Sequence, residues 1–335
     1  MAKLKDVAQL ANVSIATASR ILNNDASLSV NEDTKKAVLQ AAKQLQYIVK
    51  PKKTTKVTFA IVQWYSIDEE LSDPYYLTLR QGVESFLKSH QIAVRRIFSD
   101  DINIYQSLHD VSGIICLGKF SIEYIHKLKA LCEKIILLDM DLISPCSEVC
   151  IVLDFDNAVK QVIDYFHMLG YKKVGFLGGI EHDDDNQLYF DTRRGSFEKY
   201  CQKYQMDYQK YIMEDKFTSE SGYQMMTEMI QSQDLPEAIF AASDPIAIGA
   251  LRALFDNNIK VPDDISIIGF DNIESTNFTS PPLTTVYAPA YEMGELGAQL
   301  LYYSHLKNDS LNPMRIQLPC YLIERESCQK TRKET

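Results

Sequence analysis

Residues 4–23 read LKDVAQLANVSIATASRILN, and this stretch predicts two short helices joined by a tight turn. The first helix has an apolar face at helical spacing, formed by Leu4, Val7, Ala8 and Ala11. Residues 12–14 interrupt that spacing, and Ser14 is a suitable N-cap for a second helix that begins at Ile15. Such a pair is a helix-turn-helix, a motif whose second helix can enter the major groove of DNA.

The second helix carries side chains that suit contact with DNA. Its inward face is expected to be apolar and to consist of Ala18, Ile21 and Leu22. Arg20 can donate two hydrogen bonds to a guanine edge, and Ile15 and Ala16 can contact thymine methyl groups. Short polar side chains suit phosphate oxygens, which set the register of a protein on the duplex. The other candidate DNA-binding residues are Leu4, Ser14, Thr17, Ser19, Asn23 and Tyr47.

A third helix and the distribution of charge support a separate N-terminal module. The helix is expected from about residue 31 or 32 to Leu45, with an apolar stripe of Ala37, Val38, Ala41, Ala42 and Leu45. Residues 1–56 contain nine Lys and one Arg against four acidic residues, a net charge of +6. Because the whole chain carries −10, the remainder carries −16. A basic head on an acidic body is typical of a DNA-binding module joined to a domain that does not bind DNA.

The pattern KDVAxxAxVSxxTxSRxLN over residues 5–23 resembles the signature of the lactose/galactose-repressor family of bacterial transcriptional regulators. Ala18 stands where that family usually has Val, a small loss of volume. The resemblance implies two partners: double-stranded operator DNA of palindromic sequence, and a second copy of the chain in a homodimer.

The segment after the third helix departs from the family pattern. Members typically continue with a hinge helix whose Leu wedges into the minor groove, whereas residues 47–56 read YIVKPKKTTK. No Leu is present in this segment, and Pro51 disfavours helix at Lys50. Residues 50–56 are therefore interpreted as a basic linker that contacts phosphates without the usual kink in the DNA.

From residue 57 onward, short apolar runs alternate with helical patterns, which predicts α/β units with parallel strands. Buried strands are expected at residues 57–62, 113–117, 134–139, 174–178, 238–242 and 265–270. Helices are expected at residues 76–88, 158–169, 219–231 and 245–257. Ligands of such sheets bind at the carboxyl ends of the strands.

Three later segments extend the family resemblance to about Ser327: ASDPIAIGALRAL at 242–254, VPDDISIIGFD at 261–271 and PPLTTV at 281–286. They imply a two-lobed, periplasmic-binding-protein-like α/β domain that holds a ligand between its lobes. The expected fold class is thus α+α/β: an N-terminal three-helix helix-turn-helix domain followed by that two-lobed domain. The expected boundaries are 1–49 for the DNA-binding domain, 50–56 for the linker, 57–327 for the effector-binding and dimerisation domain, and 328–335 for a tail. Lobe one is expected at about 57–153 and 288–319, and lobe two at about 154–287 and 320–327.

The resemblance also implies a set of effector-binding residues. Arg193 resembles an arginine that binds sugar hydroxyls, and Asp271 resembles a carboxylate that accepts from a pair of them. A neutral polyol suits Arg and Asp partners together with an apolar platform, the role expected of Phe217. Ser243 stands where many members have Asn. The remaining candidates are Asp73, Tyr75, Asp139 and Tyr287, with Asp141 as an alternative to Asp139.

Each of these residues also has a structural interpretation that the sequence leaves open. Arg193 could be a surface residue beside Arg194, Asp271 could cap the helix that follows it, and Phe217 could belong to the core. Residues 65–76 (YSIDEELSDPYY) and 119–121 (KFS) resemble galactose and β-galactoside repressors of Gram-positive bacteria. Galactose or a galactoside is therefore the first choice of effector.

Other classes of protein have weaker support. The chain has no GxGxxG, P-loop or GxSxG motif, so no catalytic residues and no cofactor are expected, although an α/β enzyme remains an alternative. Its six histidines show no metal-ligand spacing, and residues 182–185 (HDDD) are interpreted as a solvated loop rather than a metal site. A cytoplasmic sugar-binding protein is a further alternative, and so is a transcriptional activator or co-repressor-dependent regulator of the same family.

The compartment follows from composition. Seven cysteines without a CxxC pair favour buried thiols in a reducing compartment over disulfides or zinc. No apolar run approaches the ~18 residues that span a bilayer, and no signal-peptide core follows Met1. A cytoplasmic, nucleoid-associated protein with no membrane partner is expected. Residues 324–335 contain no leucine heptad, so a tetramerising coiled coil is not expected.

Overall fold

A computed structural model describes residues 3–22, 30–45, 47, 57–99, 101, 103–140 and 148–329. The chain divides into two compact units, residues 1–56 (unit 1) and 57–335 (unit 2). Among the sequence expectations, Asn23, Asp141, Cys146, the hinge segment 48–56 and the end of the tail from residue 330 lie outside the described residues.

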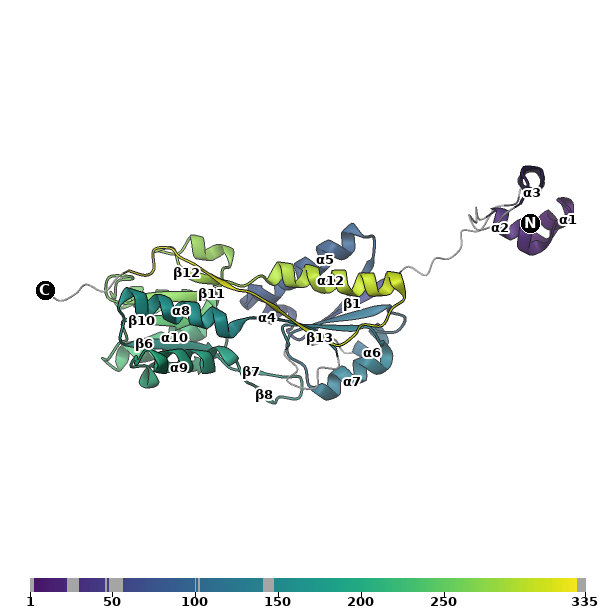
Figure 1. Cartoon of the computed structure of the whole chain (residues 1–335). Coiled ribbons are helices and arrows are strands. Elements are labelled where there is room, and N and C mark those ends of the chain that lie inside the picture. The colour runs from purple at the N-terminus through teal and green to yellow at the C-terminus, as the bar shows by residue number, and fades with distance from the viewer. Residues whose placement is uncertain are drawn as a thin grey trace. The chain divides into compact units, whose positions relative to one another are not determined.

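Unit 1 contains three helices around a small apolar core: α1 (Leu4–Leu10), α2 (Ile15–Leu22) and α3 (Glu32–Gln44) (Figure 1). Ser14 caps α2 as its sequence predicts, since its Oγ accepts from the Thr17 N–H at 3.0 Å. Asn31 caps α3 in the same way, accepting from the Thr34 N–H at 2.8 Å. The core consists of Val7, Ala8, Ala18, Ile21, Val38, Ala41 and Ala42. The three-helix prediction is thereby confirmed.

Unit 2 contains two six-stranded sheets, each covered by helices (Figure 1). The first sheet has the order β13-β5-β4-β3-β1-β2 and is parallel throughout. Its strands are β1 (Thr58–Gln63), β2 (Ala93–Ile97), β3 (Gly113–Leu117), β4 (Ile135–Leu138), β5 (Val149–Leu153) and β13 (Met314–Leu318). Its helices are α4 (Ile67–Ser72), α5 (Pro74–Ser89), α6 (Ile104–Ser107), α7 (Ile122–Leu131) and α12 (Ala290–Lys307). We call this half lobe one.

Lobe two contains the second sheet, with the order β14-β12-β11-β10-β6-β9, in which only β14 is antiparallel. The strands are β6 (Val174–Gly179), β9 (Ile212–Asp215), β10 (Ala238–Ala241), β11 (Ser266–Asp271), β12 (Thr284–Tyr287) and β14 (Tyr321–Ile323). The helices are α8 (Phe155–Leu169), α9 (Thr192–Lys203), α10 (Ser219–Gln231) and α11 (Asp244–Asp256), with short 3₁₀ turns at Gln209–Tyr211 and Glu274–Asn277. The chain passes between the lobes after β5, after β12 and after β13.

The first residue of α5, the apolar sequence of the central strands and the close packing of two helices can each be explained by particular residues. Helix α5 begins two residues earlier than predicted because Asp73 accepts from the Tyr75 N–H and Pro74 occupies the first turn, where a missing N–H costs nothing. Strands β3 and β5 are buried along their whole length, as expected for parallel strands covered on both faces. Helices α5 and α12 approach closely at Gly82, where a Cβ would lie 2.0 Å from the carbonyl oxygen of Tyr291.

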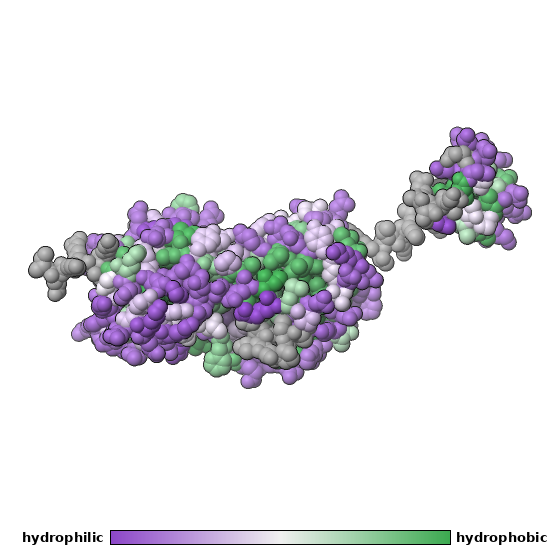
Figure 2. Space-filling model, viewed as in Figure 1, coloured by the Kyte–Doolittle hydropathy of each residue, from purple (hydrophilic) through white to green (hydrophobic). Residues whose placement is uncertain are grey.

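A two-stranded hairpin, β7 (Glu181–His182) and β8 (Leu188–Tyr189), leaves lobe two after β6 and lies toward α7 of lobe one (Figure 1). Its turn is the segment expected to be a solvated loop, but Asp184 within it contacts Ser121 of lobe one. In the view of Figure 2 the described surface of unit 2 is mostly hydrophilic, with apolar side chains gathered near its middle.

Candidate functional site

The outer face of α2 presents the residues predicted to contact DNA. Ile15 is 49% exposed, and Ala16 and Arg20 are exposed beside it. Thr17 and Ser19 are half-buried, and the Ser14 hydroxyl lies 2.8 Å from the Thr17 hydroxyl. Leu4 and Tyr47 pack against the core of unit 1. An exposed apolar side chain such as Ile15, next to an arginine and short hydroxyl-bearing residues, suits a surface that contacts base edges and phosphates.

A cavity of about 330 Å³ lies between the two lobes of unit 2 and brings most of the predicted effector residues together. Those lining it are Asp73, Tyr75, Asp139, Arg193, Phe217, Ser243 and Asp271. Lobe one contributes the first three, and lobe two contributes the other four. Asp139 and Asp271 come at the carboxyl ends of β4 and β11, where α/β sheets bind ligands.

Arg193 is held in the cavity by an acidic partner and three aromatic rings. Its guanidinium lies 4.7 to 5.2 Å from the ring centroids of Phe155, Phe217 and Phe270. Its Nε donates to Asp191 Oδ2 at 2.8 Å, Nη2 pairs with the same oxygen at 2.8 Å, and Nη1 donates to the Ala242 carbonyl. These bonds use three of the five guanidinium N–H groups, so two remain to bind a ligand.

Asp139 belongs to a buried polar cluster on lobe one. Its Oδ2 accepts from the Tyr76 hydroxyl at 2.7 Å and from Lys119 Nζ at 2.8 Å. Burial opposes the charge on Lys119, but Asp139 and the neighbouring Tyr189 and Glu181 raise the Lys119 pKa above its ordinary value. Asp139 has a φ of 61°, a left-handed conformation that costs energy for a residue other than glycine.

Asp271 and Asp73 face each other's charge across the cleft. Burial, reinforced by Asp73 and Asp244, raises the pKa of Asp271 well above its ordinary value. Burial also raises the pKa of Asp73 to about 6. Asp271 has a φ of 109°, so the backbone at the end of β11 is strained in the same way as at Asp139. Of the described non-glycine residues with positive φ, Asp139 and Asp271 are the two that line this cavity.

Tyr75 supplies a buried hydroxyl that has no hydrogen-bond partner within the described structure. Its side chain is 8% exposed and lines the cavity. Phe217 is 7% exposed, and its ring occupies the space beside Gly179, where a Cβ would lie 2.0 Å from Phe217 Cδ2. The Ser243 hydroxyl caps α11 by accepting from the Ile246 N–H.

Tyr287 is the one predicted effector residue that does not line this cavity. Its hydroxyl donates to Glu292 at 2.6 Å, and its ring packs against Tyr321 with centroids 4.8 Å apart. The structure thus places this side chain outside the cavity, and its role in effector binding stays a prediction.

The structure adds cavity residues that sequence reasoning did not select. Glu181 and Tyr189 come from the hairpin, Asp191 is the N-cap of helix α9, and Lys119 lies in the segment after β3. Lys119 Nζ lies 5.0 Å from the Tyr189 ring centroid, a contact that joins the two lobes. Burial raises the pKa of Glu181 to about 7. The only sequence signal for any of them was the resemblance over residues 119–121.

The cysteine, metal and membrane expectations can be compared with the described residues only. The six cysteines among them are free thiols. No group of three or more His, Cys, Asp or Glu side chains in this part of the chain is placed to hold a metal ion. None of the described helices is both long and apolar enough to cross a membrane.

Comparison with known proteins gives two family matches. Residues 3–50 match the family of bacterial regulatory proteins called the lacI family, and residues 163–328 match a periplasmic binding protein-like domain. The chain is 39% identical over 308 residues to the transcriptional regulator GalR of Streptococcus thermophilus, covering 90% of this chain and 92% of that protein. It is 33% identical over 355 residues to the transcriptional repressor MelR of Bacillus subtilis, covering 100% of this chain and 99% of MelR.

Two solved structures share the fold over nearly the whole chain. A lac repressor dimer bound to operator and the anti-inducer ONPF has a TM-score of 0.71 at 21% identity, covering 98% of this chain and 99% of that one. A complex of the transcriptional regulator CelR with cellobiose has a TM-score of 0.70 at 24% identity, covering 98% of this chain and 100% of that one. The architecture of a helix-turn-helix unit followed by a two-lobed α/β unit is therefore confirmed.

Proposed function

This chain belongs to the lacI family of bacterial regulatory proteins, and from that premise we propose that it is a transcriptional repressor of a sugar-utilisation operon. Acting as a homodimer in the cytoplasm and on the nucleoid, it binds palindromic operator DNA. A small neutral sugar held between the lobes of unit 2 switches that binding. The protein is a regulator and not an enzyme.

The observation that carries the sugar-binding proposal is the cleft between the lobes. Carboxylates from both lobes, a guanidinium with two N–H groups to spare and the unpaired Tyr75 hydroxyl meet beside aromatic rings. A polyol needs bidentate partners for its hydroxyls and an apolar wall for its ring. The acidic side chains outnumber Lys119, Arg193 and Arg315, so a neutral sugar is favoured over a phosphorylated or acidic one.

Galactose or a galactoside is the effector that the relatives favour. Two regulators named GalR are 39% and 32% identical to this chain, the second from Lacticaseibacillus casei over 98% of this chain. The proposed contacts are those of the seven predicted residues that line the cavity, with Lys119, Glu181 and Asp191 added.

The proposed switch follows from the position of the cleft. An effector that touches Asp139 on lobe one and Arg193 on lobe two stabilises the arrangement of lobes in which both are within reach. The protein is taken to exchange between this arrangement and a second one. The effector shifts that equilibrium only by the difference between its affinities for the two arrangements. The arrangement it disfavours is the one that holds two copies of unit 1 on operator half-sites, about 34 Å apart per helical turn.

For DNA recognition we propose that α2 enters the major groove. Arg20 reads a guanine, Ile15 and Ala16 contact thymine methyls, and Ser14, Thr17 and Ser19 contact phosphates, with Asn23, Leu4 and Tyr47 completing the interface. The proposed domain boundaries are those expected from the sequence, with residues 50–56 as the linker.

The test of this function is calorimetric titration of the full chain with galactose, lactose and glucose. We expect one galactose-containing sugar to bind in the cleft and the variant Asp271→Asn to weaken that binding about tenfold, the loss of roughly one buried hydrogen bond. Asp207→Asn removes an exposed carboxylate of lobe two outside the cleft and serves as the matched control. Equal binding by both variants would remove Asp271 from the site, and no binding of any sugar would contradict the proposal.

A further inference from the structure

A second cavity, of about 690 Å³, adjoins the effector cavity and also lies between the lobes. The two cavities share Asp73, Glu181 and Phe217 as lining residues. The second is bounded by the segment after β1 and by Phe120 and Tyr124 on lobe one, and by the β7–β8 hairpin and the segment after β9 on lobe two. These three buried residues therefore mark the boundary at which the two cavities meet.

Aromatic side chains form the lobe-one wall of the second cavity. Trp64 stacks on Tyr65 with ring centroids 4.6 Å apart, and Phe120 stacks on Tyr124 at 5.4 Å. Trp64 fits closely against Gly118, where a Cβ would lie 2.7 Å from the Trp64 Cβ, and Gly118 has a φ of +106°. Trp64 and Tyr124 are half-buried, whereas Tyr65 and Phe120 are buried. Flat rings that are partly exposed suit the apolar faces of pyranose rings, and Trp64 is the single tryptophan of the chain.

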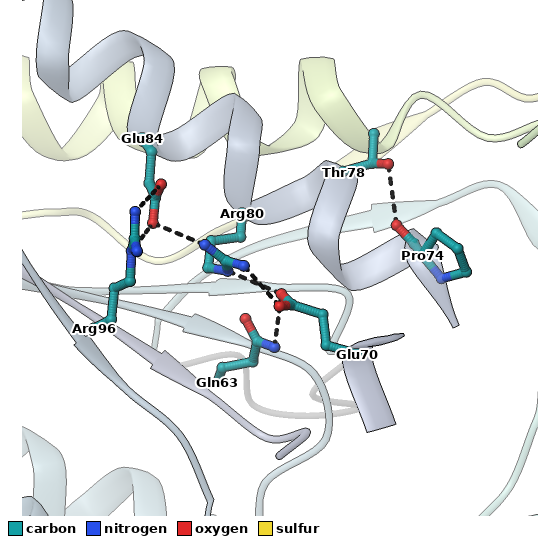
Figure 3. Close-up of polar contacts among 7 residues, drawn as sticks. All are labelled: Gln63, Glu70, Pro74, Thr78, Arg80, Glu84 and Arg96. Carbon is teal, nitrogen blue, oxygen red and sulfur yellow. Dashed lines mark hydrogen bonds and ion pairs between the residues drawn. The ribbon is translucent and has the colours of Figure 1, made fainter. Parts of the chain in front are cut away.

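Gln63 lines the same cavity and is itself buried. Its side chain is 1% exposed, and its Oε1 has no hydrogen-bond partner among the described residues. Its Nε2 donates to Glu70 Oε1 at 3.0 Å, and Glu70 is held in turn by Arg80 Nε at 2.9 Å and Nη2 at 2.6 Å (Figure 3). Because a carboxylate only accepts, this network fixes the amide with its carbonyl oxygen turned away from Glu70.

The network around Gln63 is braced from a neighbouring strand. Glu84 accepts from Arg80 Nη1 at 3.1 Å and from Arg96 Nη2 of β2 at 2.7 Å (Figure 3). A buried carbonyl oxygen held this rigidly without a donor is unfavourable, and a ligand hydroxyl, or a water that it orders, relieves the cost.

The charge of the second cavity narrows the class of ligand. Six acidic residues line it against one lysine, Lys216: Asp68, Glu69, Asp73, Glu181, Asp183 and Asp184. Sugar phosphates and uronic acids are disfavoured in such a site, whereas neutral hydroxyl groups can donate to the carboxylates.

We propose that the second cavity is a subsite for a further sugar ring, so that the effector is a neutral oligosaccharide of two or more units rather than a free monosaccharide. This inference rests on the proposed function of the cleft. One ring occupies the first cavity beside Arg193 and Phe217. The next ring lies against Trp64 and Tyr124, with a hydroxyl directed to Gln63 Oε1.

The test is calorimetric titration of the full chain with two series of sugars: galactose, melibiose and raffinose, and glucose, cellobiose and cellotriose. We expect a member of one series with two or three rings to bind at least tenfold more tightly than its monosaccharide. That oligosaccharide should also change the fluorescence of Trp64, whereas the monosaccharide should change it little.

Variants separate the two cavities. Ser72 is exposed and lines only the second, so Ser72→Phe is expected to abolish the advantage of the oligosaccharide while leaving monosaccharide affinity within twofold. Ser72→Ala is the matched control and should keep the advantage. Gln63→Met, which keeps the volume of the side chain, should weaken the oligosaccharide about tenfold and the monosaccharide little.

The outcomes are distinct. Equal affinity for one, two and three rings, unaffected by Ser72→Phe, would overturn the second subsite and leave the sugar-responsive repressor intact. Binding of no sugar in either series would overturn the proposed function together with the subsite.

Discussion

Asp184, in the turn of the β7–β8 hairpin of lobe two, accepts two hydrogen bonds from Ser121 at the start of helix α7 in lobe one. The Ser121 N–H donates at 2.5 Å and its hydroxyl at 3.1 Å. Ser121 is the N-cap of α7, so the carboxylate also meets the positive end of that helix. The hairpin thus joins the two lobes in the arrangement in which the cleft residues converge.

Removing this contact should loosen the ligand-binding arrangement. Asp184→Ala is expected to weaken effector binding about 5- to 30-fold, because hydrogen bonds of this kind contribute about 1–2 kcal/mol. Asp185→Ala is the matched control, since it removes the same charge from the neighbouring position of the same exposed turn. Calorimetry with the tightest-binding sugar checks this, and equal affinities of the two variants would show that the contact does not bias the lobes.

The unpaired hydroxyl of Tyr75 leads to a second prediction. Its removal should stabilise the ligand-free protein and weaken effector binding. Tyr75→Phe should raise the free energy of unfolding of the ligand-free protein by roughly 1 kcal/mol, because a buried group without a partner is removed. The same variant should bind effector about 5- to 10-fold more weakly, because the ligand loses a partner. Urea unfolding and calorimetry measure the two effects. A variant that is more stable and binds unchanged would exclude Tyr75 as a ligand contact.

Glu181 gives unit 2 a stability that depends on pH. Burial raises its pKa in the folded protein from 4.5 to about 7, although Lys119 and Arg193 oppose the shift. The folded state therefore holds this proton more tightly than the unfolded state does. Ionisation destabilises the fold as pH rises from about 4.5 through 7, and the effect is absent below the unfolded pKa.

The variant Glu181→Gln isolates this effect. At pH 8 it should raise the free energy of unfolding by an amount of order 1–3 kcal/mol, and at pH 4.5 it should change little. Urea unfolding followed by the fluorescence of Trp64 reports on unit 2, and Asp185→Asn on the same hairpin is the control. An equal change at both pH values would show that the charge on Glu181 does not destabilise the folded protein.

Arg20 is expected to confer sequence specificity. Arg20→Ala should cost about 1–3 kcal/mol of binding to the operator. Binding to a scrambled duplex should change much less, and Arg20→Lys, which keeps the charge, should not restore the preference for the operator. Fluorescence anisotropy at fixed salt compares the duplexes. Equal losses on operator and scrambled DNA would assign Arg20 to a phosphate.

Much of the fold was predictable because most of the central strands consist of consecutive apolar residues. The predicted runs at 113–117, 174–178 and 265–270 lie within one residue of β3, β6 and β11 at each end. Strands β2 (AVRRI) and β9 (IMED) were not predicted and lie at sheet edges, and the interior strands β5 (VCIVL) and β12 (TTVY) were also left out. An edge strand is only partly covered, so charged residues interrupt the apolar pattern that identifies a buried strand.

The site was less predictable than the fold. Residues at strand ends, such as Asp139 and Asp271, follow recognisable apolar runs, so their convergence could be anticipated from parallel topology. Glu181, Tyr189 and Asp184 belong to a hairpin whose two-residue strands are too short to show periodicity, and its acidic turn is indistinguishable from a solvated loop. Tyr287 lies outside the cavity, and its proximity in sequence to a strand end does not reveal that Glu292 binds its hydroxyl.

The most direct test of the central claim is binding of the full chain to a palindromic fragment from its own promoter region, titrated at fixed salt with galactose, melibiose, raffinose, lactose and glucose. The account predicts specific binding that one galactose-containing sugar weakens, and that no longer responds to that sugar in Asp271→Asn. Specific binding unaffected by every sugar would contradict the effector role of the cleft, and absence of specific binding would contradict the repressor itself.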